Sequence, residues 1–226
     1  MQSQRIDPVS LLGETLDSIW PVYFPLLLIG SLRFLMLVGA RLSLPPINII
    51  LLIIPFFINP LLLGTQILYI HGYFTHTSGI GEAISQTAKK FLQIILISIT
   101  TSLIVLFGII LLFFPGFYMG LRLLCSLHTT LIEYLPALDG ISRSWELTKG
   151  HWWSIFFAFF FLLFPIAIVL FILFVFFTSL ASSYSIQEEN LFIIRRFIIF
   201  LISPFGVVYS YLLYMKLKNI KELNNR

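Results

Sequence analysis

Residues 152–178 read WWSIFFAFFFLLFPIAIVLFILFVFFT, a run of 27 residues without one charged side chain. A helix needs about 20 mostly apolar residues to cross the hydrocarbon core of a membrane, so this stretch is long enough to span it. The composition of the chain agrees, because 58% of its 226 residues are hydrophobic, 11% are charged and the mean hydropathy is +0.98. These values exclude an ordinary soluble domain or a disordered chain and indicate an integral membrane protein.

Six stretches of this length and character follow one another along the chain. They are residues 21–41, 47–73, 91–114, 116–134, 152–178 and 191–215. Two crossings and a turn must fit between Phe91 and Glu133, where only Phe114-Pro115-Gly116 offers turn residues. We therefore expect an all-α integral membrane protein, with six transmembrane helices in a single polytopic domain over residues 1–226; five spans are the alternative.

The basic residues predict how the chain is oriented in the membrane. With six crossings, both termini lie on the same side. That side carries nine of the fourteen Lys and Arg residues, namely Arg5, Lys89, Lys90, Arg143, Lys149, Lys216, Lys218, Lys221 and Arg226. Because Lys and Arg are enriched in cytoplasmic loops, both termini are predicted to be cytoplasmic. The basic residues are spread between apolar runs, so no nucleic-acid partner is expected.

A segment with amphipathic helical periodicity precedes each odd-numbered span. These surface helices are predicted at residues 8–20, 80–90 and 136–149, and the first begins with Asp7-Pro8, an N-cap followed by a proline. All three are expected to lie flat on the cytoplasmic surface. The tryptophans also fall near the predicted cytoplasmic ends of spans, where they are expected to act as interface anchors: Trp20, Trp145, Trp152 and Trp153.

The order of surface helix, crossing and returning crossing occurs three times, which indicates an internal repeat of a surface amphipathic helix plus a helical hairpin. Each returning helix contains a proline and small residues that permit close helix approach, so these helices are predicted at the centre of the bundle. The helix-packing residues are Pro60, Gly64, Pro115, Gly116, Gly120, Pro204, Gly206 and Ser210. The alternative is chance, because Gly and Pro are common in membrane helices.

A series of motifs between Pro115 and Trp153 resembles a known family. It contains Pro-Gly-Phe-Tyr-Met-Gly-Leu-Arg at 115–122, Glu133, Ala137-Leu138, and Ser-Trp-Glu-Leu-Thr-Lys-Gly-His-Trp-Trp at 144–153. In these residues the chain is similar to the membrane domain fused to some bacterial glycerophosphodiester phosphodiesterases and to stand-alone YciC-like inner-membrane proteins. Elsewhere the resemblance is architectural. It implies a six-helix bundle, with many passes through the bacterial cytoplasmic (inner) membrane.

The resemblance does not carry an enzymatic activity to this chain. In the fused enzymes, catalysis belongs to a separate soluble barrel with carboxylates and histidines around a metal. No stretch of this sequence is left over to build such a barrel, so we expect no phosphodiesterase activity and no catalytic residues. The sequence also lacks a nucleophile elbow, a phosphate-binding loop and any carboxylate in the middle of a predicted span.

Arginines within or near the predicted spans are the candidate residues for binding an anionic lipid. They are Arg33, Arg41, Arg122, Arg195 and Arg196, all expected in the outer half of the membrane. An arginine at such a depth needs a partner, a water cavity or the interface, and its planar guanidinium suits a phosphate group. The alternative is that these side chains extend to the outer interface or pair with Glu188 and Glu189.

The remaining titratable residues predict neither a metal site nor a cofactor. Cys125 is the single cysteine, so no set of thiolates is available. His71 and His128 lie at comparable depths on two predicted spans, where a pair of histidines can hold a haem. A histidine near a helix end is more often only a polar residue at the interface, and we expect no haem.

These features favour a non-enzymatic accessory or scaffold role in envelope or lipid homeostasis. Membrane lipids are the expected partners, and the cytoplasmic surface helices offer a docking face for another membrane protein. The alternative is a transporter or binder of lipids or small amphiphiles, with its pathway among the proline-containing helices, because proline allows a membrane helix to bend.

Overall fold

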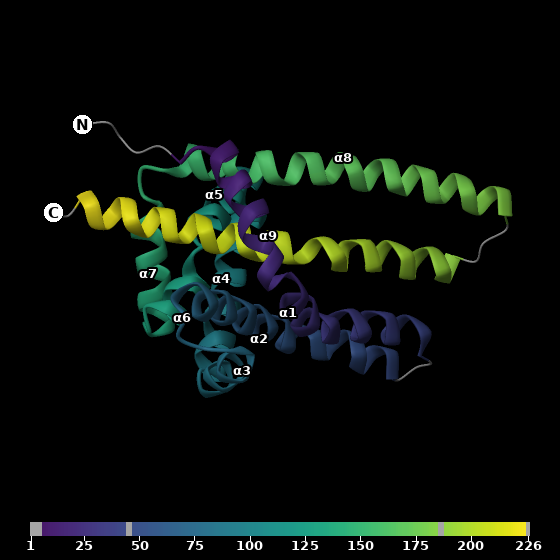
Figure 1. The fold of residues 1–226 in the computed structure, drawn as a ribbon, viewed down its shortest axis with the longest axis horizontal. Coiled ribbons are helices and arrows are strands. Elements are labelled where there is room, and N and C mark those ends of the chain that lie inside the picture. The colour runs from purple at the N-terminus through teal and green to yellow at the C-terminus, as the bar shows by residue number, and fades with distance from the viewer. Residues whose placement is uncertain (1–5, 44–46, 185–187, 225–226) are drawn as a thin grey trace.

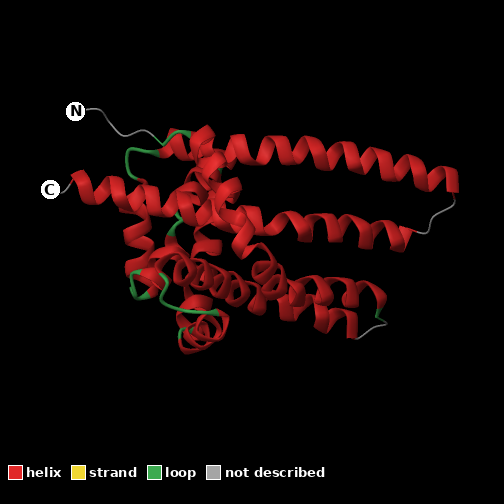
Figure 2. Ribbon diagram, in the orientation of Figure 1, coloured by secondary structure: helices red, strands yellow, loops and turns green. Residues whose placement is uncertain are grey.

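The computed structural model describes residues 6–43, 47–184 and 188–224. Within these residues, all regular secondary structure is helical and no strand occurs (Figure 2). This confirms the predicted all-α class. The helices are α1 (Pro8–Leu42), α2 (Ile47–Thr75), α3 (Ile80–Lys89), α4 (Phe91–Leu111), α5 (Phe113–Arg122), α6 (Ser126–Ile132), α7 (Ala137–Thr148), α8 (Trp152–Tyr184) and α9 (Glu188–Asn224).

Four long helices define the long axis of the molecule. In Figure 1, α8 and α9 run antiparallel along this axis, and α2 runs beside the later part of α1. The start of α1 and the end of α9 lie toward one end, which we call the terminal end. The end of α1, the start of α2, the end of α8 and the start of α9 lie toward the opposite end, which we call the far end.

The first predicted surface helix and the first predicted span form one continuous helix, α1. The Asp7 carboxylate caps it by accepting hydrogen bonds from the backbone nitrogens of Val9 and Ser10, both at 3.2 Å. Pro21 and Pro25 lie inside the helix. An interior proline removes one backbone hydrogen bond and bends a helix without having to end it. Accordingly, α1 starts across the other long helices and then turns to run beside α2 (Figure 1).

The predicted fourth span, residues 116–134, is divided between the short helices α5 and α6. The chain turns first at Leu112, three residues before the expected Pro115, and breaks again between Arg122 and Ser126. The hydroxyl groups of Ser144 and Thr148 on α7 donate to the carbonyl oxygen of Arg122, at 2.8 and 3.2 Å. These bonds satisfy the carbonyl at the break from outside the helix, so the backbone can change direction there.

Within the described residues, five helices are long and apolar enough to cross a membrane: Pro8–Leu42, Ile49–Thr75, Phe91–Leu111, Trp152–Leu180 and Glu189–Leu223. The six-span prediction is therefore not confirmed, and the alternative of five matches this number. The threefold repeat is not confirmed either. Its first surface helix is part of α1, and its second unit lacks a long returning helix.

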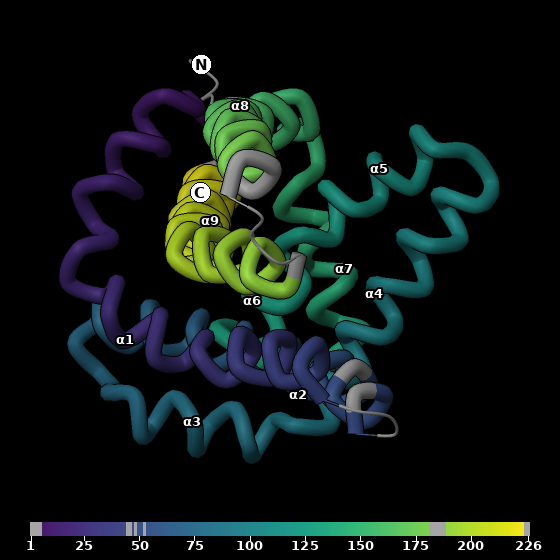
Figure 3. Tube along the Cα trace, turned by 90° about the vertical axis from the view of Figure 1, so that its right-hand side faces the viewer, coloured from purple at the N-terminus to yellow at the C-terminus, as the bar shows by residue number. Residues whose placement is uncertain are grey.

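The helices at the terminal end run across the long axis. In Figure 1, α3 is seen end-on and α7 lies across the end of the bundle near the end of α9. In Figure 3, which looks along the axis from the far end, α4 and α5 extend sideways as a hairpin. The predicted surface helices at 80–90 and 136–149 correspond to α3 and α7.

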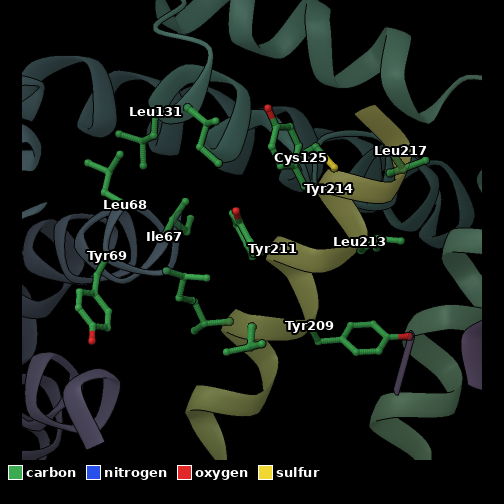
Figure 4. Packing of buried hydrophobic residues seen from close by; sticks show 14 of the residues in the cluster. Ile67, Leu68, Tyr69, Cys125, Leu131, Tyr209, Tyr211, Leu213, Tyr214 and Leu217 are labelled. Atoms are coloured by element: carbon green, nitrogen blue, oxygen red, sulfur yellow. The ribbon is translucent and has the colours of Figure 1, made fainter. Parts of the chain in front are cut away.

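The core lies toward the terminal end, where α2, α6 and α9 meet. Figure 4 shows Tyr209, Tyr211 and Tyr214 projecting from α9 among apolar side chains of the neighbouring helices. Tyr209 and Tyr214 are completely buried. The Tyr209 hydroxyl donates to the Ala158 carbonyl of α8, and the Tyr214 hydroxyl donates to Glu133. Each buried hydroxyl thus has a partner, as a polar group in an apolar core requires.

Candidate functional site

A cavity of about 630 Å³ lies among α1, α2, α4, α9 and the junction of α5 and α6. Its lining combines apolar side chains with an unusual share of polar ones for a membrane protein. The polar lining residues are Arg33, Asn59, Gln66, Ser98, Thr101, Ser102, Ser126, Arg196, Ser203 and Ser210. A volume of this size is typical of sites that bind small organic molecules.

The cavity lies deep along the long helices. An α-helix rises about 1.5 Å per residue, so Arg196 lies about 12 Å and Ser210 about 33 Å from the start of α9 at Glu188. By the same measure, Arg33 lies about 14 Å from the end of α1 at Leu42. Both arginines therefore lie well inside their helices, away from the helix ends at the far end.

Aromatic rings join α1 to α9 at the level of the two arginines. Phe34, next to Arg33, stacks on Phe200 with ring centroids 5.2 Å apart and contacts Phe197 edge-on at 5.8 Å. The Arg196 guanidinium lies over the Phe192 ring, 5.2 Å from its centroid. These contacts fix the backbones that present Arg33 and Arg196 to the same cavity.

The positive charge of the cavity has no carboxylate counterpart among the described residues. The lining contains two arginines and no Asp or Glu, and neither arginine forms a salt bridge with a described residue. Asn59 adds an acceptor to the cavity, because its Oδ1 is buried and has no hydrogen bond within the described part of the chain. The arrangement is suited to an anion with hydrogen-bonding oxygens.

Gln66 stabilises the wall opposite α9. Its side chain is 6% exposed, and its Nε2 donates to the carbonyl of Leu26 on α1 at 2.9 Å. This bond joins α2 to α1 directly beside the cavity. Ser210 on α9 lies between the cavity and the core, with its hydroxyl 3.5 Å from Nε2 of the buried His128.

The structure separates the five arginines that the sequence groups together. Arg33 and Arg196 line the cavity. The Arg41 guanidinium lies 6.0 Å from the centroid of the Phe192 ring, which also contacts the Arg196 guanidinium. Arg195, by contrast, lies over the Phe174 ring of α8 at 4.3 Å and donates to the Thr178 hydroxyl. Adjacent positions on α9 therefore face different surroundings.

Arg122 lies apart from the cavity and contacts α7. It is 4% exposed, and its guanidinium lies 4.3 Å from the centroid of the Trp145 ring and 5.8 Å from that of Tyr118. With its carbonyl oxygen bound by two hydroxyl groups of α7, Arg122 connects α5 to α7 through both its backbone and its side chain. This arrangement is typical of helix packing.

The predicted helix-packing residues also have different surroundings. A Cβ atom at Gly64 would lie 3.3 Å from Ile94 and Leu131, and one at Gly116 would lie 2.8 Å or less from the backbone of Gly108 and Ile109, so helices approach closely at both positions. At Gly120 the nearest atom, in Val105, would be 3.9 Å away. Three of the others line the cavity, namely Pro60, Gly206 and Ser210. Pro204 is buried in α9.

The tryptophans form two groups. Trp20 and Trp153 are largely exposed, at 68% and 64%, as expected of residues that face lipid or its headgroups. Trp145 and Trp152 instead both contact the Tyr118 ring, with centroids 6.1 and 5.7 Å away. Trp145 and Trp152 therefore do more than lie near a helix end, because they join α7 and α8 to α5.

His71, His128 and Cys125 lie near α9 and the core, and within the described residues they form no metal-binding cluster. His71 Nδ1 lies 3.1 Å from the Tyr211 hydroxyl, and the His128 ring stacks on Tyr214. Cys125 is buried, and burial raises the pKa of its thiol to about 12, with the nearby Glu133 adding to the effect. In the described part of the chain, no group of three His, Cys, Asp or Glu residues is placed to hold a metal ion.

Glu133 forms the ion pair that its position in the sequence suggests. Its carboxylate accepts a hydrogen bond from Arg143 Nε at 3.0 Å and another from the Tyr214 hydroxyl at 2.8 Å. Arg143 is thus the ion-pair partner of Glu133. Glu133 ties the end of α6 to both α7 and α9, which is a structural role.

Most of the polar lining of the cavity is not among the candidate site residues predicted from the sequence. Ser98, Thr101 and Ser102 are spaced three and four residues apart, which places them on one face of α4. This pattern was visible in the sequence as a polar stripe in an otherwise apolar helix. Asn59 and Gln66 were also visible as amides within an apolar run. Their convergence with Arg33 depends on the packing of α1, α2 and α9.

Comparison with curated proteins and with solved structures finds no significant match. Comparison with known protein families matches residues 90–224, more than half of the chain, to the membrane domain of glycerophosphoryl diester phosphodiesterase. The matched region runs from the start of α4 to the end of α9 and includes the motifs at 115–122 and 144–153. This chain therefore belongs to the family of glycerophosphoryl diester phosphodiesterase membrane domains.

Proposed function

We propose that this membrane protein binds an anionic lipid headgroup in the cavity between α1, α2 and α9, and that it does so without catalysing a reaction. The observation that carries the proposal is the presence of Arg33 and Arg196 in one cavity whose described lining holds no carboxylate. Arg33 and Arg196 are both exposed to this cavity and its mouth. An arginine without a counterion is costly in a membrane, and a phosphate oxygen would offset that cost.

The rest of the lining suits the other parts of a lipid. Hydroxyl and amide groups such as Ser102 and Asn59 provide hydrogen bonds for a polar headgroup, while Leu37, Leu63 and Phe200 provide apolar contacts for chains. Such a mixture of a few polar groups in an apolar lining is typical of sites for amphiphiles. In this proposal the protein serves as an accessory component in lipid homeostasis of a bacterial inner membrane.

Transport of the same lipid is the second candidate function. Pro60 and Gly206 both line the cavity, and Pro204 lies one turn before Val207, which also lines it. Proline leaves a backbone carbonyl without its helical partner and allows a helix to bend, so these positions are suited to a change in the shape of the cavity. Flux of a labelled lipid in proteoliposomes that depends on Pro60 and Pro204 would distinguish a transporter from a binder.

Lipid retention by the purified protein tests the proposed binding. Native mass spectrometry in mild detergent, with added phosphatidylglycerol, should detect a lipid adduct on the wild type. Arg196→Ala should weaken it about ten-fold or more, because a charge-assisted hydrogen bond contributes about 1.5–3 kcal/mol. Arg33→Ala should act in the same direction.

Arg195→Ala is the matched control, because it removes the same charge from the neighbouring position on α9 but faces Phe174 rather than the cavity. It should retain lipid as the wild type does. Equal retention by the Arg195 and Arg196 variants would contradict the proposal. Competition with inorganic phosphate separates the possible ligands, since displacement by phosphate alone would indicate a site for the free anion.

A further inference from the structure

We propose that α4 and α5 form a hairpin embedded in one leaflet of the membrane, entering and leaving it at the terminal end without crossing to the far end. We call Phe91–Arg122 the hairpin and Leu111–Phe114 its tip. The partner of this hairpin is the acyl-chain layer of the leaflet at the terminal end. The chain would then cross the membrane through α1, α2, α8 and α9.

The length of α5 supports a hairpin confined to one leaflet. The 21 residues of α4 span about 31 Å, enough to cross, but the 10 residues of α5 span only about 15 Å. A hydrocarbon core measures about 30 Å, so α5 can cover at most about half of it in any orientation. The tip therefore lies within about 15 Å of Arg122.

Both ends of the hairpin are anchored at the terminal end. Lys90, just before α4, donates to the carbonyl oxygens of Thr130 and Leu131 in α6, at 3.3 and 3.0 Å. Arg122, at the end of α5, is bound by Ser144 and Thr148 of α7, which lies at the terminal end in Figure 1. Figure 3 shows the hairpin extending sideways from this anchor, across the direction of α8 and α9.

The surface of the hairpin fits acyl chains. No residue from Phe91 to Leu121 carries a charge. The four residues of the tip are the most exposed apolar stretch of the hairpin, with exposed fractions of 75%, 68%, 69% and 81% from Leu111 to Phe114. Such a surface is unfavourable in water and would be covered by lipid at the depth of the anchor.

Three features reduce the polarity of the backbone at the tip. The Leu112 nitrogen donates to the Gly108 carbonyl at 3.1 Å, and Pro115 in the first turn of α5 has no N–H to satisfy. Gly108 and Gly116 let the two helices touch, because a Cβ at Gly108 would lie 2.6 Å from the Gly116 Cα. Each backbone group that is paired or absent at this turn lowers the cost of placing it in lipid, where an unpaired backbone group is expensive.

Thiol labelling of the whole protein in sealed vesicles tests the hairpin. Phe114→Cys places a thiol at the tip, where the side chain packs little and the substitution should not disturb folding. Leu42→Cys marks the far end and Thr77→Cys the terminal end. We expect a membrane-impermeant maleimide to label the Leu42 and Thr77 variants from opposite sides and the Phe114 variant from neither.

A depth measurement completes the test. A nitroxide at Phe114→Cys should lie in the half of the bilayer nearer the terminal end, with Val169→Cys on α8 as the reference for a crossing helix. Labelling of Phe114→Cys from the same side as Leu42→Cys would show that α4 crosses and would overturn the proposal. Labelling from the side of Thr77→Cys, or a depth in the far half, would overturn it as well.

Discussion

At the residue scale, neighbouring or similar arginines serve different purposes because their surroundings differ. Arg196 faces a cavity, Arg195 stacks on Phe174, and Arg122 stacks on Trp145 in a site that is almost closed to solvent. A guanidinium over an indole contributes up to about 2 kcal/mol when the pair is desolvated. Arg122 should therefore stabilise the fold, whereas Arg33 and Arg196 should affect ligand binding.

We predict that Arg122→Ala lowers the melting temperature of the detergent-solubilised protein but leaves lipid retention unchanged. Arg122→Lys should recover only part of the stability, because an ammonium group does not stack on Trp145 as a planar guanidinium does. Intrinsic tryptophan fluorescence during heating measures the first effect and native mass spectrometry the second. A variant that melted like the wild type would show that this contact contributes nothing to stability.

Also at the residue scale, His128 should make the stability of the protein depend on pH. Burial lowers the pKa of His128 from 6.5 to about 4. Between these values the unfolded chain binds more protons than the folded protein, so the free energy of unfolding decreases as the pH falls. At most, this amounts to about 1.4 kcal/mol for each pH unit within that window.

The prediction is that the melting temperature falls between about pH 7 and about pH 5, and that it falls less in His128→Phe. Phenylalanine keeps a ring that can stack on Tyr214 and removes the titrating group. Part of the dependence should remain, because burial and the nearby Lys221 also lower the pKa of His151. An identical pH dependence in wild type and His128→Phe would show that His128 does not titrate in this window.

At the scale of the element, the α4–α5 hairpin depends on two glycines that face each other. A Cβ at Gly116 would lie 2.4 Å from the Ile109 nitrogen, a distance that backbone atoms cannot accommodate without moving. Gly120, one turn further along α5, meets only the Val105 side chain, at an ordinary contact distance. Substitution by alanine should therefore be destabilising at Gly116 and tolerated at Gly120.

We predict that Gly116→Ala destabilises the protein by about 1–3 kcal/mol, the usual cost of overpacking. Gly120→Ala should be neutral or slightly stabilising, because alanine is the better helix former. Chemical denaturation in a mild detergent, followed by circular dichroism, compares the two variants. If Gly120→Ala were the more destabilising of the pair, the packing of the hairpin described above would be wrong.

At the scale of the whole molecule, the start of α1 and the end of α9 lie at one end, and the end of α8 and the start of α9 lie at the other, as do the end of α1 and the start of α2. The single cysteine helps to test this arrangement, because Cys125 is buried and its raised pKa disfavours the reactive thiolate. Labelling of the wild type should therefore be weak. Engineered cysteines can be compared against that low background without first removing the native one.

We predict that Lys218→Cys and Thr77→Cys are labelled from one side of the membrane and Glu189→Cys from the other. In intact bacterial cells, the positive-inside rule places the first two in the cytoplasm, so an impermeant reagent should reach only Glu189→Cys. Labelling of all three variants from one side would contradict the arrangement in Figure 1. Labelling of Lys218→Cys alone in intact cells would reverse the predicted orientation.

The sequence by itself determined the class of the protein. Long apolar runs such as 152–178 predict membrane helices, because lipid is the environment that suits their side chains. The motifs at 115–122 and 144–153 indicated the family, and the match to residues 90–224 shows it. Nearness along the chain also favours an ion pair between a carboxylate that ends one helix and a cation on the next, as Glu133 and Arg143 form.

Only the tertiary structure decided the number of long helices and the composition of the cavity. Hydropathy does not distinguish a crossing helix from a hairpin, because both need an apolar surface. The helix break at Arg122 also depends on distant residues, since its carbonyl is bound by hydroxyl groups of α7 that lie twenty-two or more residues away in the sequence. Likewise, Arg33 and Arg196 line one cavity because α1 packs against α9, where Phe34 stacks on Phe200. Periodicity assigns a residue to a face of its own helix, but the neighbour of that face is set by packing between helices.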